Sequence, residues 1–321
     1  MMQEQQQNYI KQVTIKGLWD KFDLDWELNP DVNILAGGNG MGKSTVLRIL
    51  KYNLLLCKIA IDANQSEELK KEVQDKSYEV HTFVDSSIIE LCNGVICSVI
   101  SKNVDKEKGT GQAQISIDTK KLEEDFELQS SFFTAIDLPL KALEAVQKLS
   151  DHRVKTDLDW ELHHAQIAYI NYQLNIGRER DEILDRGIEE DAMKKIQALR
   201  KPRLLLIEIL NKLFEETNKK VDIDSNEISF LLDNKEKLHA YKLSAGEKQI
   251  LTILLRAICQ NQQPAIFILD EPEASLHIDW QKKLIGLIRQ LNPNVQLIIA
   301  THSPAILTEG WFNKVFNIQD L

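Results

Sequence analysis

The stretch with the clearest chemistry is residues 37–45, GGNGMGKST, which fits the pattern G-x-x-x-x-G-K-[S/T]. An apolar run, VNILA, precedes it and an apolar helix pattern follows it, so an incidental glycine-rich turn is disfavoured. Glycines let successive backbone N–H groups turn inward around phosphate oxygens. We expect Lys43 to reach the β- and γ-phosphates of a nucleoside triphosphate and the Ser44 hydroxyl to ligate Mg²⁺. The predicted nucleotide-binding residues here are Gly37, Asn39, Gly40, Gly42, Lys43, Ser44 and Thr45.

Residues 265–273, AIFILDEPE, bring two acidic residues to the end of an apolar run. If the run is a buried strand, Asp270 lies at its carboxyl end, where ligands usually bind in such sheets. Asp270 could then hold Mg²⁺ or its waters, and Glu271 could orient or deprotonate the attacking water. Paired acids at a strand end are also common as surface residues. The glycine-rich loop favours the catalytic interpretation.

Two further stretches place polar residues at the ends of apolar segments. LIIATHSP, residues 297–304, puts His302 after a strand pattern, where it could touch the γ-phosphate or the water, although a lone histidine there is more often structural. LSAGEKQ, residues 243–249, opens the apolar helix pattern ILTILLRAI. A helix N-terminus with a small residue suits a phosphate. Ser244 followed by Glu247 is equally an ordinary helix cap with a first-turn acid.

The hydrophobic pattern predicts how these residues are positioned. Residues 12–36 indicate two or three strands, a helix starts near Lys43, and residues 78–136 are mostly strand-like. Residues 139–218 are helical in pattern, with Pro202 expected to break or kink the last helix. After them, apolar strands alternate with helices, which indicates a parallel sheet covered on both faces. We therefore expect an α/β fold with an N-terminal antiparallel β region and a helical insertion.

The four motifs occur in the order GGNGMGKST, LSAGEKQ, ILDEPEASLH and IIATHSP. In this order they resemble the Walker A motif, signature, Walker B motif with D-loop, and switch histidine of an ABC-type ATPase head, a P-loop NTPase. The resemblance implies that Ser244, Gly246 and Glu247 complete the ATP site of a second head. Catalysis would then need a head-to-tail dimer closed around two ATP. It also implies that residues 1–138 and 219–321 form the head and that residues 139–218 are the insertion.

The signature points to one branch of these ATPases. Lys43 and Ser244 lie 201 residues apart (244 − 43), farther than in transporter heads, and His277 stands where transporter D-loops commonly have Asp. LSAGEKQ and DEPEASLHIDWQ resemble the SMC, RecF and OLD branch, in particular the stand-alone ATPases of anti-phage systems such as Septu, PARIS and retron-associated modules. This resemblance implies slow ATP hydrolysis by a subunit that controls a separate effector, such as a nuclease. A DNA-clamping repair or chromosome-maintenance ATPase and a transporter subunit remain alternatives.

Composition limits the partners. The formal net charge of −10 disfavours nucleic-acid binding by the whole molecule but leaves room for a local basic groove. Four scattered cysteines do not suggest a disulfide framework. A polar start and the lack of a long apolar run predict a cytoplasmic protein without direct membrane contact. Its expected partners are a second copy or more of itself, the effector, and nucleic acid as an open option.

One basic segment in the predicted insertion has no role in these motifs. KKIQALRKPR, residues 194–203, contains Lys194, Lys195, Arg200, Lys201 and Arg203. It could touch phosphate groups or an acidic face of a partner. A solvated basic helix is the interpretation that the pattern favours.

Overall fold

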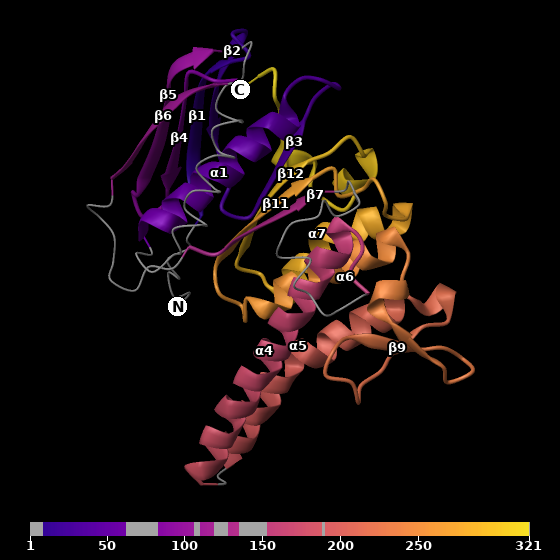
Figure 1. Ribbon diagram of the computed structural model, residues 1–321. Helices are drawn as coiled ribbons and strands as arrows, with labels where there is room; N and C mark the ends of the chain where they lie inside the picture. Colours follow the sequence, from indigo (N-terminus) through magenta and orange to yellow (C-terminus); the bar gives the residue numbers. More distant parts are fainter. Residues whose placement is uncertain are drawn as a thin grey trace. The chain divides into compact units, whose positions relative to one another are not determined.

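The computed structural model describes residues 9–61, 83–105, 110–118, 128–134, 153–187 and 190–320. The chain forms two compact units, each shown in Figure 1. The first contains Met1–Phe133, Pro264–Glu271 and Asn294–Leu321, and the second contains Thr134–Gln263 and Pro272–Pro293. The boundaries of the head and the insertion at residues 138/139 and 218/219 stay a prediction.

The first unit contains an antiparallel sheet of five strands in the order β2-β1-β4-β5-β6. Its strands are β1 (Ile10–Leu18), β2 (Phe22–Glu27), β4 (Ser86–Leu91), β5 (Ile96–Asp105) and β6 (Thr110–Asp118). Every neighbouring pair is antiparallel. Buried and exposed positions roughly alternate along β1, as expected for a sheet with one face on the core. The predicted N-terminal antiparallel β region is confirmed.

A second sheet of the same unit has the order β13-β3-β12-β11-β7. Its strands are β3 (Val32–Ala36), β7 (Ser130–Thr134), β11 (Ala265–Asp270), β12 (Val295–Ala300) and β13 (Val315–Asn317). β13, β3, β12 and β11 pair in parallel. Asp270 is opposite Ala300, and Ala300 is opposite Leu35, so three strands end at the same edge of the sheet. This register brings together the three motifs that follow these strands, GGNGMGKST, ILDEPEASLH and IIATHSP.

Helix α1 (Lys43–Ile61) contacts strands of both sheets. Its buried residues Val46, Leu47 and Leu50 belong to one hydrophobic core with Ile266 of β11 and Ile298 of β12. Burial of aliphatic side chains contributes roughly 25 cal/mol per Å² of apolar surface removed from water, so this contact fixes the helix against the sheet. The predicted α/β fold class is confirmed.

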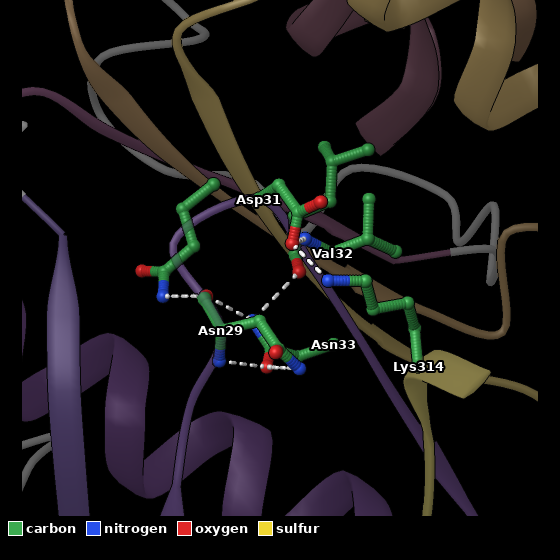
Figure 2. Close-up of polar contacts among 7 residues, drawn as sticks. Asn29, Asp31, Val32, Asn33 and Lys314 are labelled. Carbon is green, nitrogen blue, oxygen red and sulfur yellow. Dashed lines mark hydrogen bonds and ion pairs between the residues drawn. The ribbon is translucent and has the colours of Figure 1, made fainter.

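Polar side chains fix the start of β3, as Figure 2 shows. Asn33 is fully buried and bonds twice to the backbone of Asn29: its Oδ1 accepts from the Asn29 N–H at 2.7 Å, and its Nδ2 donates to the Asn29 carbonyl at 2.8 Å. Asp31 Oδ1 accepts from the Val32 N–H at 2.7 Å and from Lys314 Nζ at 2.8 Å. A buried amide must be hydrogen-bonded to avoid a desolvation cost. These bonds hold the strand that leads into the glycine-rich loop.

The second unit is built on two long helices, α4 (Asp157–Asp185) and α5 (Glu190–Leu213). Thr156 caps α4: its side chain accepts from the backbone of Asp159, whose side chain accepts from the Thr156 backbone. α5 continues through Pro202, so the expected break is wrong. Proline removes one helical hydrogen bond. Contacts of α5 with α4, α6 and α7 hold the helix in spite of that loss.

Helices α6 (Ala245–Cys259) and α7 (Ile278–Leu291) pack in the same unit, beside a small antiparallel sheet of β8 (Lys220–Val221), β9 (Ser229–Leu231) and β10 (Lys237–His239). α4 lies along α6, and Lys248 Nζ donates to Asp159 Oδ1 at 2.7 Å. Both side chains are largely buried. Short 3₁₀ turns occur at Glu215–Thr217, Ala240–Lys242, Pro304–Leu307 and Phe312–Lys314. None of the described helices is long and apolar enough to span a bilayer.

Candidate functional site

A cavity of about 490 Å³ lies in the first unit, beside the strand ends. Six residues of the predicted glycine-rich set line it, together with the acid and the histidine predicted from the other two strand ends. The lining residues are Trp19, Asn39, Gly40, Met41, Gly42, Lys43, Ser44, Thr45, Glu271 and His302, with Gly40 to Thr45 contiguous in the chain. The structure therefore gathers residues that are up to 283 positions apart (302 − 19) around one space.

The glycine-rich loop turns back on itself before α1. Gly40 and Gly42 have φ angles of 73° and 97°, which residues with a Cβ rarely adopt. α1 starts at Lys43, and the Val46 N–H donates to the Gly42 carbonyl at 2.9 Å. The N–H groups of the first helical turn have no partner within the helix, and with the helix dipole they suit an anion.

Lys43 is nearly buried, with 5% of its surface exposed. Its Nζ donates to the carbonyls of Gly37 at 2.8 Å and Gly38 at 3.0 Å, and it lies 2.8 Å from His302 Nε2. An ammonium group carries only donors, so this third contact requires an unprotonated Nε2 on His302. Three acceptors thus position the ammonium group at the mouth of the loop.

Ser44 and Asp270 meet at the end of β11. Ser44 Oγ donates to Asp270 Oδ1 at 2.8 Å, and Asp270 is 8% exposed. Mg²⁺ prefers oxygen ligands in octahedral geometry at 2.0–2.1 Å, so two adjacent ligand oxygens lie about 2.9 Å apart. The spacing of these two oxygens fits a pair of adjacent Mg²⁺ ligands. Among the described residues no group of three or more His, Cys, Asp or Glu could hold a metal by itself.

Glu271 has an unusual backbone for a residue directly after a strand. Its φ angle is 49°, in the left-handed region, and its N–H donates to the Ala300 carbonyl at 2.8 Å. Non-glycine residues in this region cost of order 1–3 kcal/mol and cluster at functional sites. Its Oε1 lies 3.5 Å from His302 Nε2. The neighbouring strand thus holds Glu271 in a conformation that places its carboxylate at the cavity beside His302.

The residues of LSAGEKQ lie in the second unit, where they form the start of α6. Ser244 Oγ accepts from the Glu247 N–H, and Glu247 Oε2 accepts from the Ser244 N–H at 3.0 Å, so the capping arrangement is present. Gly246 has a packing reason, because a Cβ there would overlap the backbone carbonyl oxygen of Ser275. From the sequence, we expect the small residue at this position to let a phosphate approach the helix. In the structure, the backbone at Ser275 approaches Gly246 closely.

Glu247 is also one half of a largely buried ion pair. Its Oε1 accepts from Lys219 Nζ at 2.7 Å, and the side chains are 7% and 15% exposed. Burial raises the pKa of Glu247, but the Lys219 ammonium and the hydrogen bonds from Ser244 outweigh it and hold the pKa below its ordinary 4.5. Glu247 is therefore a structural anchor of the α6 N-terminus.

Trp19 is the residue of the cavity that the motifs did not indicate. It lies in the turn between β1 and β2 with a φ angle of 54°, and its N–H donates to the Phe83 carbonyl at 2.7 Å. Its ring lies against Gly42. The only signal in the sequence is a bulky aromatic residue in a short polar turn, LWDKF, which by itself indicates no ligand.

Comparisons with known proteins agree with this geometry. A family model described as "AAA domain, putative AbiEii toxin, Type IV TA system" matches residues 111–308. The chain is 22% identical to Septu protein PtuA of Bacillus thuringiensis over 95% of its own length and 74% of the relative. It is 28% identical to the Retron Vc95 probable ATPase of Vibrio cholerae serotype O1 biovar El Tor, over 31% of the chain and 23% of that relative. The chain thus spans only about a quarter of the retron protein.

Solved structures of an SmcHead bound to the C-winged helix domain of ScpA and of RecF are also similar to this chain. They give TM-scores of 0.49 and 0.43 at 15% and 14% identity. The matches cover 93% and 94% of this chain, and 91% and 94% of those chains.

The resemblance to Septu and retron ATPases that the motifs indicated is confirmed by these relatives. The matched region begins within β6 and includes Ser244, Asp270, Glu271 and His302. The matched family, covering well over half of the chain, and the cavity at the glycine-rich loop together show that this chain is an ABC-type ATPase and belongs to the family described as "AAA domain, putative AbiEii toxin, Type IV TA system".

Proposed function

We propose that the protein binds Mg-ATP in the 490 Å³ cavity, hydrolyses it slowly, and uses the ATP-bound state to control a separate effector protein. The observation that supports this best is the convergence of Lys43, Ser44, Glu271 and His302 on one space, with Asp270 in contact with Ser44. These residue types supply phosphate binding, metal ligation and activation of water at adjacent positions.

The phosphate chain would lie along the glycine-rich loop. Its oxygens would accept from the N–H groups of the loop and the first turn of α1. Lys43 would exchange one of its present carbonyl acceptors for β- and γ-phosphate oxygens. The exchange replaces a neutral acceptor with a charged one, which makes a stronger hydrogen bond.

Ser44 and Asp270 are the residues that would hold the metal. Bound Mg²⁺ would neutralise charge on the β- and γ-phosphates. Ser44 would turn its hydroxyl proton away from Asp270, so that both oxygens face the metal. The short separation of these oxygens means that neither residue has to move far.

Glu271 would act as the general base on the attacking water. Its side chain is 46% exposed, so water reaches the carboxylate, and the strained backbone fixes its direction. His302 would orient the same water or contact the γ-phosphate. The His302 Nε2 lies near both Lys43 Nζ and Glu271 Oε1. Its contacts would therefore change when a phosphate oxygen takes its place beside Lys43.

Trp19 would stack on the base of the nucleotide. It is the one aromatic residue of the cavity lining, and its ring already lies against the loop at Gly42. Stacking on an aromatic side chain is worth about 1–3 kcal/mol per base and tolerates different bases. Trp19 would therefore raise affinity more than it would select adenine.

A second copy would complete the active site. Ser244 and Gly246, at the N-terminus of α6, would face the γ-phosphate held by the partner head, so that ATP joins two copies head to tail. This part rests on the motif resemblance. The Ser244 hydroxyl accepts from the Glu247 N–H and donates to Glu247 Oε2 at 3.0 Å, so its proton would turn from Glu247 to the partner's phosphate when the dimer forms.

The effector role is supported by the similarity to Septu protein PtuA along nearly the whole chain. Septu is one of the anti-phage systems whose ATPases the motifs of this chain resemble. We propose that this protein acts in the same class, as an ATPase subunit whose nucleotide state holds or releases a nuclease-type effector.

The test is the oligomeric state of a Glu271→Gln variant in ATP and Mg²⁺, measured by light scattering after gel filtration. Loss of the base should lower turnover about 10²–10³-fold and leave ATP binding intact. The variant should therefore accumulate as an ATP-bound dimer, whereas the same variant without nucleotide stays smaller. Unchanged turnover would show that Glu271 is not the base.

Two substitutions at Ser244 distinguish an effect on ATP-dependent dimerisation from an effect on folding. Asp and Asn both cap helices well, so either retains α6. In the Glu271→Gln background, Ser244→Asp should prevent the ATP dimer by repelling the partner's triphosphate, and Ser244→Asn should allow it. Equal dimer formation by both variants would contradict the signature role while leaving nucleotide binding in place.

A further inference from the structure

A second cavity, of about 430 Å³, lies between α4 and α5 in the second unit. Tyr172, Gln173, Ile176 and Gly177 of α4 line one side. Ile196, Leu199 and Leu204 of α5 contribute apolar surface to the other side. Ligand sites typically have volumes of about 300–1,000 Å³ and combine apolar walls with a few polar groups. The cavity is large enough for a mononucleotide-sized molecule and shares no residue with the glycine-rich site.

Among the residues that the structure describes, three arginines and no acidic residue line this cavity, although the chain as a whole carries a net charge of −10. They are Arg180 of α4 and Arg200 and Arg203 of α5. Arg180 pairs with the exposed neighbour Asp181 at 2.7 Å, and such surface pairs contribute little. Arg203 uses one amino group for the Ile223 carbonyl at 3.2 Å. Guanidinium groups bind phosphate bidentately, so their concentration here favours an anionic ligand.

Gly177 keeps one wall of the cavity open. It lies inside α4, where glycine costs roughly 0.5–1 kcal/mol relative to alanine. A Cβ at this position would meet no atom within 4 Å. Packing inside the protein therefore does not require glycine here. The space beside its backbone is therefore open to the cavity.

Among the described residues of the cavity, the Tyr172 hydroxyl is buried without a hydrogen-bond partner. Tyr172 is only 6% exposed, and burial raises its pKa to about 12, so the hydroxyl keeps its proton and remains a donor. Leaving a buried donor unsatisfied is unfavourable. An anion bound in the cavity would give the Tyr172 hydroxyl an acceptor.

We propose that the α4–α5 cavity is a second ligand site, which binds a nucleoside monophosphate-sized molecule with its phosphate on Arg180, Arg200 and Arg203 and its ring on the apolar wall beside Gly177. A solvated basic helix would explain Lys194, Lys195 and Lys201, which do not line the cavity. It does not explain why the arginines of both helices face one apolar space.

Occupancy of this cavity would be transmitted to α6. The same α4 that supplies Tyr172 and Gly177 carries Asp159, which holds Lys248 of α6 at 2.7 Å. Lys248 is next to Glu247, the residue that caps this helix. A ligand that fixes α4 against α5 would thereby fix the start of α6.

The test uses the Lys43→Ala variant, in which the glycine-rich site is disabled, so that its outcome does not depend on ATP binding there. The probes are AMP, GMP and inorganic phosphate, measured by isothermal titration calorimetry at constant ionic strength. We expect saturable binding of one AMP or GMP per chain. Arg200→Gln should weaken it about 10-fold or more, because bonds to charged groups contribute about 1.5–3 kcal/mol. Gly177→Leu should abolish it by filling the space.

Two matched variants control for charge and for helix stability. Arg178→Gln removes the same charge from an exposed position of α4 outside the cavity lining, and Gly177→Ala adds a single methyl group. Both should retain binding within about 3-fold, and thermal melting verifies that every variant is folded. An equal loss with Arg178→Gln, or no saturable binding of any probe, would overturn the proposal. Inorganic phosphate binding as tightly as AMP would overturn the role of the apolar wall.

Discussion

Trp19 and Glu271 both have left-handed backbones, with φ angles of 54° and 49°, and both line the nucleotide cavity. Neither residue type adopts this region without help from its surroundings. The backbone N–H of each residue is held by a neighbouring strand or segment, from Trp19 to Phe83 and from Glu271 to Ala300. Strained residues cluster at functional sites, so strain at two lining residues of one cavity suggests that the positions of these side chains matter more than local stability.

Replacement of Trp19 tests its contact with the base. Trp19→Ala should weaken ATP binding roughly 10-fold, because stacking is worth about 1–3 kcal/mol. Binding of inorganic tripolyphosphate should be unchanged, since that molecule has no base. Titration calorimetry with both ligands measures the difference, and Trp19→Phe, which keeps an aromatic ring, should recover most of the ATP affinity. An equal loss for both ligands would mean that Trp19 only supports the loop at Gly42.

Helix α6 is attached to its surroundings by polar contacts in its first turn, in addition to its buried apolar side chains. Ser244, Glu247 and Lys219 form one connected set of bonds at its start, and the Lys248 ion pair attaches the same turn to α4. Removing one partner of a buried pair leaves an uncompensated charge, which is more costly than the pair is stabilising. The stability of this unit should therefore respond to pH through Glu247.

The pKa of Glu247 is lowered in the folded protein, so its ionised form stabilises the fold above the unfolded pKa and this contribution is lost as pH falls through the folded pKa. Glu247→Gln should lower the free energy of unfolding at pH 7, by at most the roughly 3–5 kcal/mol typical of removing one partner of a buried ion pair. The difference between the variant and the parent should shrink as pH falls below 4.5 through the lowered pKa of Glu247. Denaturant unfolding at several pH values measures this. Glu208→Gln, at an exposed position of α5, is the control and should differ little from the parent at any pH.

At the scale of the whole molecule, the charge of −10 disfavours binding of DNA by the whole surface, and the two proposed ligand sites are local exceptions to that charge. The two cavities described above each lie within one unit and are formed from residues of that unit. With both proposed sites, binding of a partner protein would depend on two ligands, ATP and the ligand of the α4–α5 cavity.

Purification from the native operon at native level, with ATP and Mg²⁺, should recover a nuclease-type protein in fixed ratio with this chain. Mass spectrometry identifies the partner, and light scattering gives the stoichiometry. The Lys43→Ala variant should change the yield of the complex, because the proposed contact depends on the nucleotide state. A dimer without a partner, binding duplex DNA only with ATP and losing it as salt rises, would favour the DNA-clamping alternative instead.

The nucleotide site could be predicted from the chain alone because its chemistry is local. A phosphate loop needs glycines at Gly40 and Gly42 and a helix starting at Lys43, all within a few residues. Apolar strands that end in Asp270 and His302 could be placed at one sheet edge because parallel strands end on the same side. These parts of the fold follow from short-range sequence patterns.

Only the tertiary structure decided the rest, because it depends on contacts between residues far apart in the chain. Trp19 reaches the cavity through the turn of a distant hairpin. Gly246 is required by the backbone carbonyl of Ser275, which a Cβ at this position would overlap. Pro202 stays inside a helix because neighbouring helices hold it. The arginines of α4 and α5 share one cavity only because these two helices pack side by side, which no periodicity of either helix could show.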